Sequence, residues 1–281
     1  MPDTARPWVL ITGCSSGIGK ALVSVCRAAG WGVVATARRP ADLAELPAGE
    51  DLRTLNLDVT SAESIALGVR ACADLRLVAL INNAGYGQMG PLEFIRPEEL
   101  RAQFETNVVG LHAVTNAFLP LIRKHATQGE GRIVQVASML GRLSIPLAGP
   151  YNASKHAVVA LAETLRLEIG REIHVVLVEP GAVASSFRTT IARSWGDLPQ
   201  RIQGTRYERI LAGFMKTREK QAEHFAGSPE QAARCILKAL TRKRPPRRIL
   251  IRPEARLAGW AKAVMPAALW EWLLRRSYGL H

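Results

Sequence analysis

The chain has 281 residues, 48% of them hydrophobic, and carries a formal net charge of +13. This composition supplies enough apolar surface for a sizeable core and excludes a wholly disordered chain. Neither a transmembrane helix nor a secretory signal is expected, because no apolar run is long enough. The basic charge alone would suit nucleic-acid binding, but no nucleic-acid-binding motif accompanies it, so we expect a solvated basic face and no nucleic-acid partner.

The four cysteines, Cys14, Cys26, Cys72 and Cys235, show no spacing typical of metal ligands. We therefore expect no metal site. Reduced, mainly buried thiols are typical of a cytoplasmic protein, and we expect that location.

Short apolar runs that predict buried strands alternate with helical patterns along the chain. The strands are expected at residues 8–12, 31–37, 52–57, 77–81, 132–137, 173–178 and 248–251. The helices are expected at residues 20–29, 61–72, 98–125, 151–168 and 229–240. This alternation is typical of an α/β fold with a Rossmann-type, doubly wound parallel sheet in a single domain.

A glycine-rich turn joins the first strand to the first helix. Residues 12–19 read Thr-Gly-Cys-Ser-Ser-Gly-Ile-Gly. Glycines at such a turn let the backbone approach a pyrophosphate, whose charge the helix N-terminus stabilises, so the segment predicts a dinucleotide site. The residues expected at the cofactor are Gly13, Ser15, Ser16, Gly17, Ile18 and Gly19.

Two arginines, Arg38 and Arg39, stand at the end of the second strand, where an acidic residue would bind the ribose of NAD. The first acid beyond them is Asp42. A guanidinium can grip a 2′-phosphate through two hydrogen bonds. The pair therefore predicts NADP(H) as cofactor, with two solvated arginines as the alternative.

Tyr151 and Lys155 are four residues apart and share one face of a predicted helix. A neighbouring ammonium favours the phenolate and lowers the tyrosine pKa, which suits an acid/base group that works near neutral pH. Asn107 lies inside a predicted helix, where asparagine is unfavourable, and this indicates a special hydrogen-bonding task. Ser138 directly follows a strand, and the fourth strand ends in the amide and small residues 82–85, as in a ligand crevice.

In this order and spacing the motifs resemble the short-chain dehydrogenase/reductase family, in its compact single-domain branch. The matching residues are Thr12, Gly13, Gly17, Gly19, Asp58, Asn82, Asn83, Ala84, Gly85, Asn107, Ser138, Tyr151, Lys155, Pro180 and Gly181. The glycine-rich turn and the basic, apolar C-terminus resemble the steroid- and retinol-dehydrogenase-like members. Where the family often has threonine shortly after Pro-Gly, this chain has Ser185 or Ser186.

The resemblance implies an oxidoreductase in which Tyr151 is the general acid in reduction and the general base in oxidation. It implies that Lys155 lowers the tyrosine pKa and binds the nicotinamide ribose. Ser138 would donate to the substrate oxygen, and Asn107 would hold a water in a proton relay. A homodimer or homotetramer is implied as well. The further cofactor contacts that the resemblance implies are Asp58, Val59, Asn83, Ala84, Gly85, Pro180, Gly181, Val183 and Ser185.

The segments expected to face the substrate are 87–90, 139–147 and the stretch after Gly181. They are mainly apolar and favour a hydrophobic ketone, aldehyde or alcohol. Residues 186–227 are long, polar and irregular for a connection, and we expect a substrate lid there. The cofactor domain with this lid would span residues 1–252. A helical appendage over 253–281, rich in tryptophan and arginine, would either lie at a membrane surface as a peripheral contact or pack over the pocket or a dimer interface, and packing is favoured.

Two alternatives share parts of this pattern. A catalytically inactive, NADP(H)-sensing regulatory protein would keep the fold, but it would not need Asn107, Ser138, Tyr151 and Lys155 together. A nucleotide-sugar epimerase or dehydratase would share the Tyr151 and Lys155 pair, but the glycine spacing fits the compact branch better.

Overall fold

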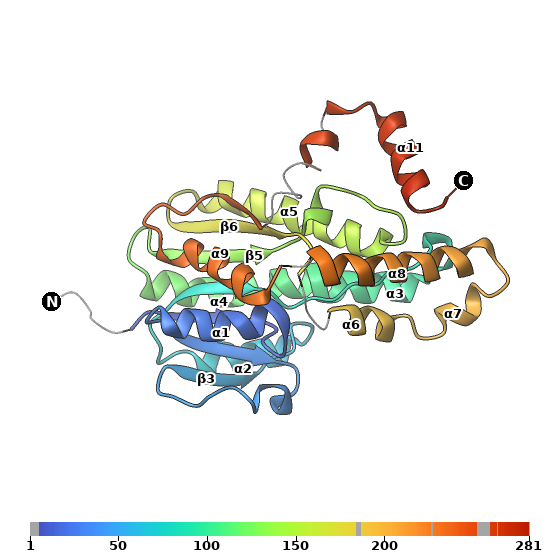
Figure 1. Ribbon diagram of the computed structural model, residues 1–281. Coiled ribbons are helices and arrows are strands. Elements are labelled where there is room, and N and C mark those ends of the chain that lie inside the picture. The colour runs from blue at the N-terminus through green and yellow to red at the C-terminus, as the bar shows by residue number, and fades with distance from the viewer. Residues whose placement is uncertain (1–5, 184–186, 226, 252–258, 263, 281) are drawn as a thin grey trace.

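The computed structural model describes residues 6–183, 187–225, 227–251, 259–262 and 264–280. The strands of this described part form one sheet in the order β3-β2-β1-β4-β5-β6-β7 (Figure 1), and each neighbouring pair runs parallel. The strands are β1 (Trp8–Ile11), β2 (Gly32–Ala37), β3 (Leu52–Asn56), β4 (Leu77–Asn82), β5 (Gly131–Val136), β6 (Ile173–Pro180) and β7 (Arg248–Ile251). The predicted Rossmann-type sheet is confirmed.

Helices cover both faces of this sheet (Figure 1). They are α1 (Gly17–Ala28) and α9 (Pro229–Thr241) on one face, and α2 (Ala62–Ala71), α4 (Leu111–His125) and α5 (Gly149–Ile169) on the other. Neighbouring residues of β1 point to opposite faces, so Val9 packs in the α1 and α9 core and Leu10 in the other. Because both faces are covered, β2, β4 and β5 are buried throughout, which explains the unbroken apolar run of β4 before Asn82.

The predicted long helix at 98–125 has an interruption. It begins as α3 (Pro97–Phe104), continues as a π-helical turn (Glu105–Gly110) and ends as α4. Single turns of π-helix are rare in proteins, and those that occur often lie at functional sites. Short 3-10 turns, Pro40–Leu43, Leu92–Phe94 and Met139–Gly141, lie in the connections between the larger elements.

The expectation of an irregular connection at 186–227 is wrong. Its described residues form the helices α6 (Phe187–Ser194), α7 (Leu198–Arg201) and α8 (Arg206–Phe225). In α8, Tyr207, Ile210, Leu211, Phe214 and Met215 recur at the spacing of one helical face, and all of them pack in or against an apolar cluster. The many charged residues of this segment conceal that period in the sequence.

The C-terminal part follows β7 and ends in α11 (Ala267–Ser277), which stands apart from the sheet in Figure 1. Pro266 is the N-cap residue of this helix. Among the described residues, no helix is both long and apolar enough to cross a membrane.

Candidate active site

Tyr151 and Lys155 lie near the N-terminus of α5, and both are buried. The Lys155 Nζ lies 5.8 Å from the centroid of the Tyr151 ring and donates a 2.9 Å hydrogen bond to the carbonyl oxygen of Val136, the last residue of β5. Burial lowers the pKa of Lys155 from 10.5 to about 8. The predicted pair is therefore together, at the carboxyl end of a central strand.

Ser138 stands two residues beyond the end of β5 and is also buried. Its Oγ accepts a 3.2 Å hydrogen bond from the backbone N–H of Leu140 and so caps the turn Met139–Gly141. Gly141 lets this turn approach α5, because a Cβ there would lie 2.8 Å from the carbonyl oxygen of Lys155. Ser138 and Lys155 are thus both held at the carboxyl end of β5.

Asn107 is fully buried in the π-helical turn, and its amide binds the loop after β4. Its Nδ2 donates to the carbonyl oxygen of Tyr86 at 2.9 Å and to the Oγ of Ser154 at 3.1 Å, and its Oδ1 accepts from the backbone N–H of Tyr86 at 3.1 Å. A Cβ on Gly85 would lie 3.0 Å from Asn107 Oδ1 and 3.8 Å from Lys155 Nζ. Asn107 thus has hydrogen-bond partners in the loop after β4 and in α5, and glycine at 85 leaves the space between the amide and the ammonium open.

The glycine-rich turn could hold a dinucleotide. Its backbone packs closely against the protein at Gly19, and the N-terminus of α1 remains available to an anion. Gly13 and Gly17 have φ angles of +73° and +56°, which favour glycine. A Cβ on Gly19 would lie 2.0 Å from the carbonyl oxygen of Gly13, so no side chain fits there. In α1, the first turn has no acidic residue and the Ser16 side chain does not cap it, so its N-terminus suits a phosphate. The predicted Ser15 is exposed, whereas Ser16 and Ile18 are half-buried.

The loop after β4 fixes this turn. Asn83 Nδ2 donates to the carbonyl oxygens of Thr12 and Gly13, both at 3.0 Å. In return, Thr12 Oγ1 accepts the backbone N–H groups of Asn83 at 2.9 Å and of Ala84 at 3.0 Å. The predicted cofactor residues of two different strands are therefore joined in one unit.

The two arginines after β2 have different surroundings. Arg39 binds Asp42 through Nε at 3.2 Å and Nη2 at 2.9 Å. Arg38 is exposed, and its charge acts on Tyr86, whose phenol pKa is raised by burial and drawn back by this arginine. The charge of Arg38 thus acts on the loop after β4, while the guanidinium of Arg39 is paired locally.

The remaining predicted cofactor residues lie at the ends of β3 and β6. Asp58 Oδ1 accepts the N–H of Thr60 at 2.9 Å and its hydroxyl at 2.7 Å, and Val59 is buried. Pro180 ends β6, and the N–H of Gly181 donates to Ile251 at 3.2 Å. Val183 forms a bridge with Gly227 across the base of the segment that contains α6 to α8. Ser185 lies outside the described residues.

Tyr151 belongs to an apolar cluster that the sequence identified only in part. The segments 87–90 and 139–147 contribute as expected, with Met89, Leu140, Leu143 and Leu147. The cluster also contains residues of α6, α7 and α8, and side chains of α11 pack against it. The sequence assigned 186–227 to a lid but singled out none of the residues that meet here. The members of the cluster that it did not name are Phe94, Ala148, Ile191, Trp195, Leu198, Ile202, Tyr207, Ile210, Leu211, Phe214, Met215 and Tyr278.

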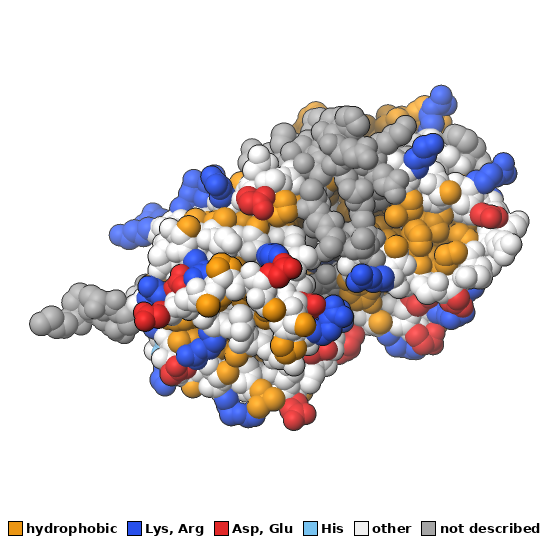
Figure 2. All heavy atoms as spheres, turned by 60° about the horizontal axis from the view of Figure 1, so that its bottom comes forward, with side chains coloured by type: hydrophobic (Ala, Val, Ile, Leu, Met, Phe, Trp, Pro, Cys, Tyr) orange, Lys and Arg blue, Asp and Glu red, His pale blue; other side chains and the backbone are white. Residues whose placement is uncertain are grey.

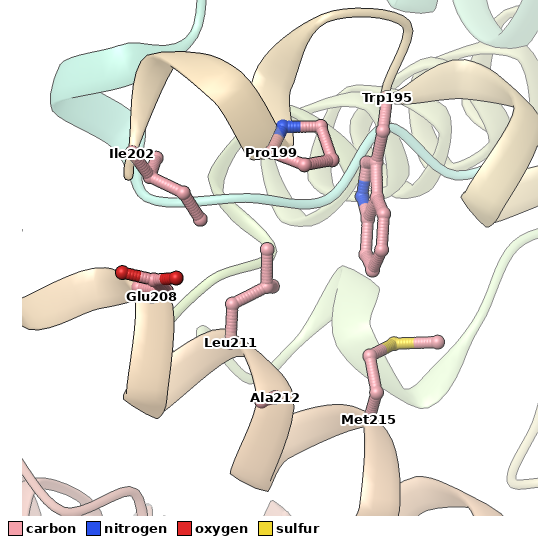
Figure 3. A pocket seen from close by; sticks show the side chains of 7 residues that line it. All are labelled: Trp195, Pro199, Ile202, Glu208, Leu211, Ala212 and Met215. Atoms are coloured by element: carbon pink, nitrogen blue, oxygen red, sulfur yellow. The ribbon is translucent and has the colours of Figure 1, made fainter. Parts of the chain in front are cut away.

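Hydrophobic side chains gather over the α6–α8 segment on the face shown in Figure 2. There a pocket of about 320 Å³ lies between Trp195, Pro199 and Ile202 on one side and α8 on the other (Figure 3). Leu211 and Met215 of α8 line the pocket and also pack in or against the cluster of Tyr151. The helical period of α8 was a signal that could have identified this helix and its apolar face, although not the cluster against which that face packs.

Comparison with known proteins agrees with these features. The family model described as short chain dehydrogenase matches residues 7–195. The 3-ketodihydrosphingosine reductase of Bacteroides thetaiotaomicron is 33% identical over 97% of this chain and 98% of that protein. The 17-beta-hydroxysteroid dehydrogenase type 6 of Rattus norvegicus is 31% identical over 96% of this chain and 88% of its own. A solved short chain dehydrogenase/reductase of Burkholderia phymatum, in complex with NAD, superposes with a TM-score of 0.80 at 26% identity and covers 94% of this chain and 95% of that one.

Proposed function

Because this chain belongs to the short-chain dehydrogenase family of oxidoreductases, we propose that it is an NADP(H)-dependent enzyme that interconverts a hydrophobic ketone or aldehyde and the corresponding alcohol. The observation that carries the proposal is the position of Tyr151. Its side chain lies in an apolar cluster, while the ammonium of Lys155 lies 5.8 Å from its ring. An apolar carbonyl compound can meet a proton donor there.

The chain's own residues would move and orient the proton. In reduction, Tyr151 would give its phenolic proton to the substrate oxygen as the carbonyl carbon receives a hydride, and in oxidation it would take the proton back. Lys155 favours the phenolate through its charge, and Ser138 would donate a hydrogen bond to the oxygen where negative charge develops. A bound nicotinamide supplies or accepts the hydride.

Asn107 would act as a positioning residue for this proton path. Its amide is fixed on both sides by the backbone of Tyr86, and Gly85 keeps the space beside Lys155 open. A water held in that space would link the lysine to solvent after Tyr151 has lost its proton.

The preference for NADP(H) rests on Arg38. It is exposed after β2 and close enough for its charge to act on Tyr86, whereas Arg39 is already paired with Asp42. Among the residues that the structure describes, no carboxylate pairs with Arg38, and such a guanidinium suits the 2′-phosphate that distinguishes NADP from NAD.

The substrate class follows from the walls around Tyr151. The cluster is built from leucine, methionine, isoleucine and aromatic side chains, and the relatives are named for a hydroxysteroid and a ketodihydrosphingosine. We expect a lipophilic carbonyl compound, with the α6–α8 segment as the lid that covers it.

For assembly and location, we propose a cytoplasmic homodimer or homotetramer. Val109 in the π-helical turn and Leu167 on α5 are 48% and 83% exposed, which suits a contact between copies through these helices. The free thiols of Cys14, Cys26 and Cys72 are buried, as in proteins of a reducing compartment.

The test is a screen of initial rates with ketosteroids, retinal, long-chain acyl ketones and small aldehydes, each with NADPH and with NADH. Turnover of one lipophilic class, faster with NADPH, is expected. Tight NADPH binding without turnover of any class in either direction would favour the sensing protein. Turnover of small aldehydes alone would contradict the hydrophobic substrate.

A further inference from the structure

Helix α11 presents apolar side chains on two sides. On the inner side, Trp270 and Tyr278 pack against the apolar cluster that contains Tyr151. The ring of Tyr278 lies 5.8 Å from that of Phe214 in α8, centroid to centroid. This side is therefore occupied by the protein itself, as the favoured interpretation of the sequence expected.

The outer side of α11 is apolar as well. Leu269, Trp272 and Leu273 are 46%, 54% and 37% exposed. With Arg276 they occupy positions i, i+3, i+4 and i+7, so the four side chains form one stripe. The guanidinium carbon of Arg276 lies 5.7 Å from the centroid of the Trp272 ring. A helix with apolar side chains on opposite sides is unusual at a water-exposed position, so the stripe indicates a further neighbour.

The segment before α11 also carries exposed apolar side chains. Trp260 and Val264 are 64% and 58% exposed. Between them, Lys262 donates a 2.8 Å hydrogen bond from Nζ to the carbonyl oxygen of Arg142, in the turn region next to Ser138. The segment is thus tied to the loop that carries part of the candidate active site.

The charged residues in and before α11 indicate what kind of neighbour would cover the stripe. Lys262, Arg275 and Arg276 are exposed, and Glu271 is the one acidic residue of the described residues 259–262 and 264–280. Tryptophan and arginine suit the headgroup layer of a bilayer, because the indole N–H and the guanidinium meet lipid oxygens while leucine enters the acyl region. A second protein copy would have to pair these polar groups as it buried them.

We infer that this face of the chain, which we call the α11 surface and define by Trp260, Val264, Leu269, Trp272, Leu273, Arg275 and Arg276, docks on an anionic lipid membrane. The net charge of +13 adds a general attraction to the same partner. The inference rests on the proposed function in one respect only, namely that docking would let the enzyme take a lipophilic substrate from the bilayer. The docking itself needs no turnover.

The experiment is co-sedimentation of the full-length protein with vesicles. Vesicles of phosphatidylcholine alone are compared with vesicles of equal parts phosphatidylcholine and phosphatidylglycerol, at low and high salt. We expect the partition coefficient on the anionic vesicles to be at least about tenfold higher at low salt, with a blue shift of tryptophan fluorescence on binding. The difference should shrink at high salt.

Two variants locate the contact. Trp272→Glu places a carboxylate on the outer stripe and should lower the partition coefficient at least about tenfold. Leu67→Glu makes the same kind of change at an exposed apolar residue of α2, away from the proposed contact between copies, and should leave vesicle binding unchanged. Circular dichroism, thermal midpoint and NADPH binding of both variants should match the parent.

Equal vesicle binding by Trp272→Glu and the parent would overturn the inference, as would failure of the parent to bind either vesicle. A concentration-dependent dimer that Trp272→Glu dissociates, without vesicle binding by the parent, would assign the surface to a second copy instead. Vesicle binding without turnover of any carbonyl compound would sustain the docking and contradict the proposed function, so the two can fail separately.

Discussion

Lys155 donates its 2.9 Å hydrogen bond to the carbonyl oxygen of Val136, two residues before Ser138. The ammonium and the hydroxyl are therefore positioned by the same strand end, although they come from segments 17 residues apart in the chain. The carbonyl holds the ammonium without neutralising it. This arrangement keeps a positive charge in a buried place, and that has a cost in stability.

The first prediction concerns that cost. Burial brings the pKa of Lys155 down to about 8 in the folded protein, below its value of 10.5 in an unfolded chain. The unfolded chain thus binds this proton more tightly, so the contribution of Lys155 to the free energy of unfolding rises with pH between about 8 and 10.5, and the full penalty applies below about pH 8. Lys155→Met should raise the free energy of unfolding at pH 7 by about 1–3 kcal/mol.

Urea unfolding at pH 7 and near pH 10 measures this effect, and the gain should shrink at the higher pH. Lys238→Met on α9, where the lysine is exposed, is the control and should change little. Activity of Lys155→Met should be lost despite the added stability. A variant less stable than the parent at pH 7 would show that the bond to Val136 outweighs the burial of the charge.

The second prediction is that Tyr151→Phe lowers kcat by at least about 100-fold, because the proton donor is removed and the ring remains. NADPH affinity, measured by fluorescence titration, should stay within about twofold, since the phenol hydroxyl contributes little of the binding energy. Tyr207→Phe is a matched control, because Tyr207 packs against the same apolar cluster. A Tyr151→Phe enzyme that kept most of its kcat would contradict the assignment of Tyr151 as the acid/base group.

The third prediction separates the two arginines after β2. Arg38→Ala should raise the Kd for NADPH by about 10- to 100-fold, because a charge-assisted contact to the 2′-phosphate is lost, and should leave the Kd for NADH nearly unchanged. Arg39→Ala should have a smaller effect on NADPH, since its guanidinium already binds Asp42. Isothermal titration with both cofactors measures these constants. An equal loss for NADPH and NADH in Arg38→Ala would argue against 2′-phosphate recognition.

The fourth prediction tests the glycine-rich turn. Gly19→Ala would place a Cβ 2.0 Å from the carbonyl oxygen of Gly13, so the backbone must shift. We expect a loss of about 2 kcal/mol or more in the free energy of unfolding and a large rise in the Kd for NADPH. Gly213→Ala on α8, where a Cβ meets no atom within 4 Å, should instead stabilise the protein by about 0.5–1 kcal/mol. Unchanged NADPH binding in Gly19→Ala would contradict the assigned role of the turn.

The parallel sheet and the meeting of the candidate site residues could be predicted because their signals are local. An unbroken apolar run predicts a buried strand, and the polar residues that follow successive strands must meet at one edge of a parallel sheet. The unfavourable place of Asn107 in a helix marks it as a candidate site residue. Its partner could not be identified in this way, because the hydrogen bonds to Tyr86 depend on how two segments pack.

The wall opposite Tyr151 could not be predicted for a different reason. Leu211 and Phe214 lie on a helix that is mainly charged on its other faces, and its apolar stripe gives no strand signal. The side chains of α11 reach the same cluster from beyond β7. Which distant helix covers a cluster depends on tertiary packing, which the local period of a sequence does not encode.

The π-helical turn fixes the spacing between Asn107 and Gly110. At one of its residues, the Asn107 amide binds Tyr86 after β4, and three residues later a Cβ on Gly110 would lie 2.7 Å from the carbonyl oxygen of Val59 after β3. The turn therefore contacts the loops after β3 and β4 at once, so the number of residues between these two contacts is fixed. Removing one residue between Asn107 and Gly110 would rotate the following residues by about 100° about the helix axis. Leu111 would then take the place of the glycine against Val59. This stretch should thus reject single-residue insertions and deletions that the exposed ends of α3 and α4 would accept.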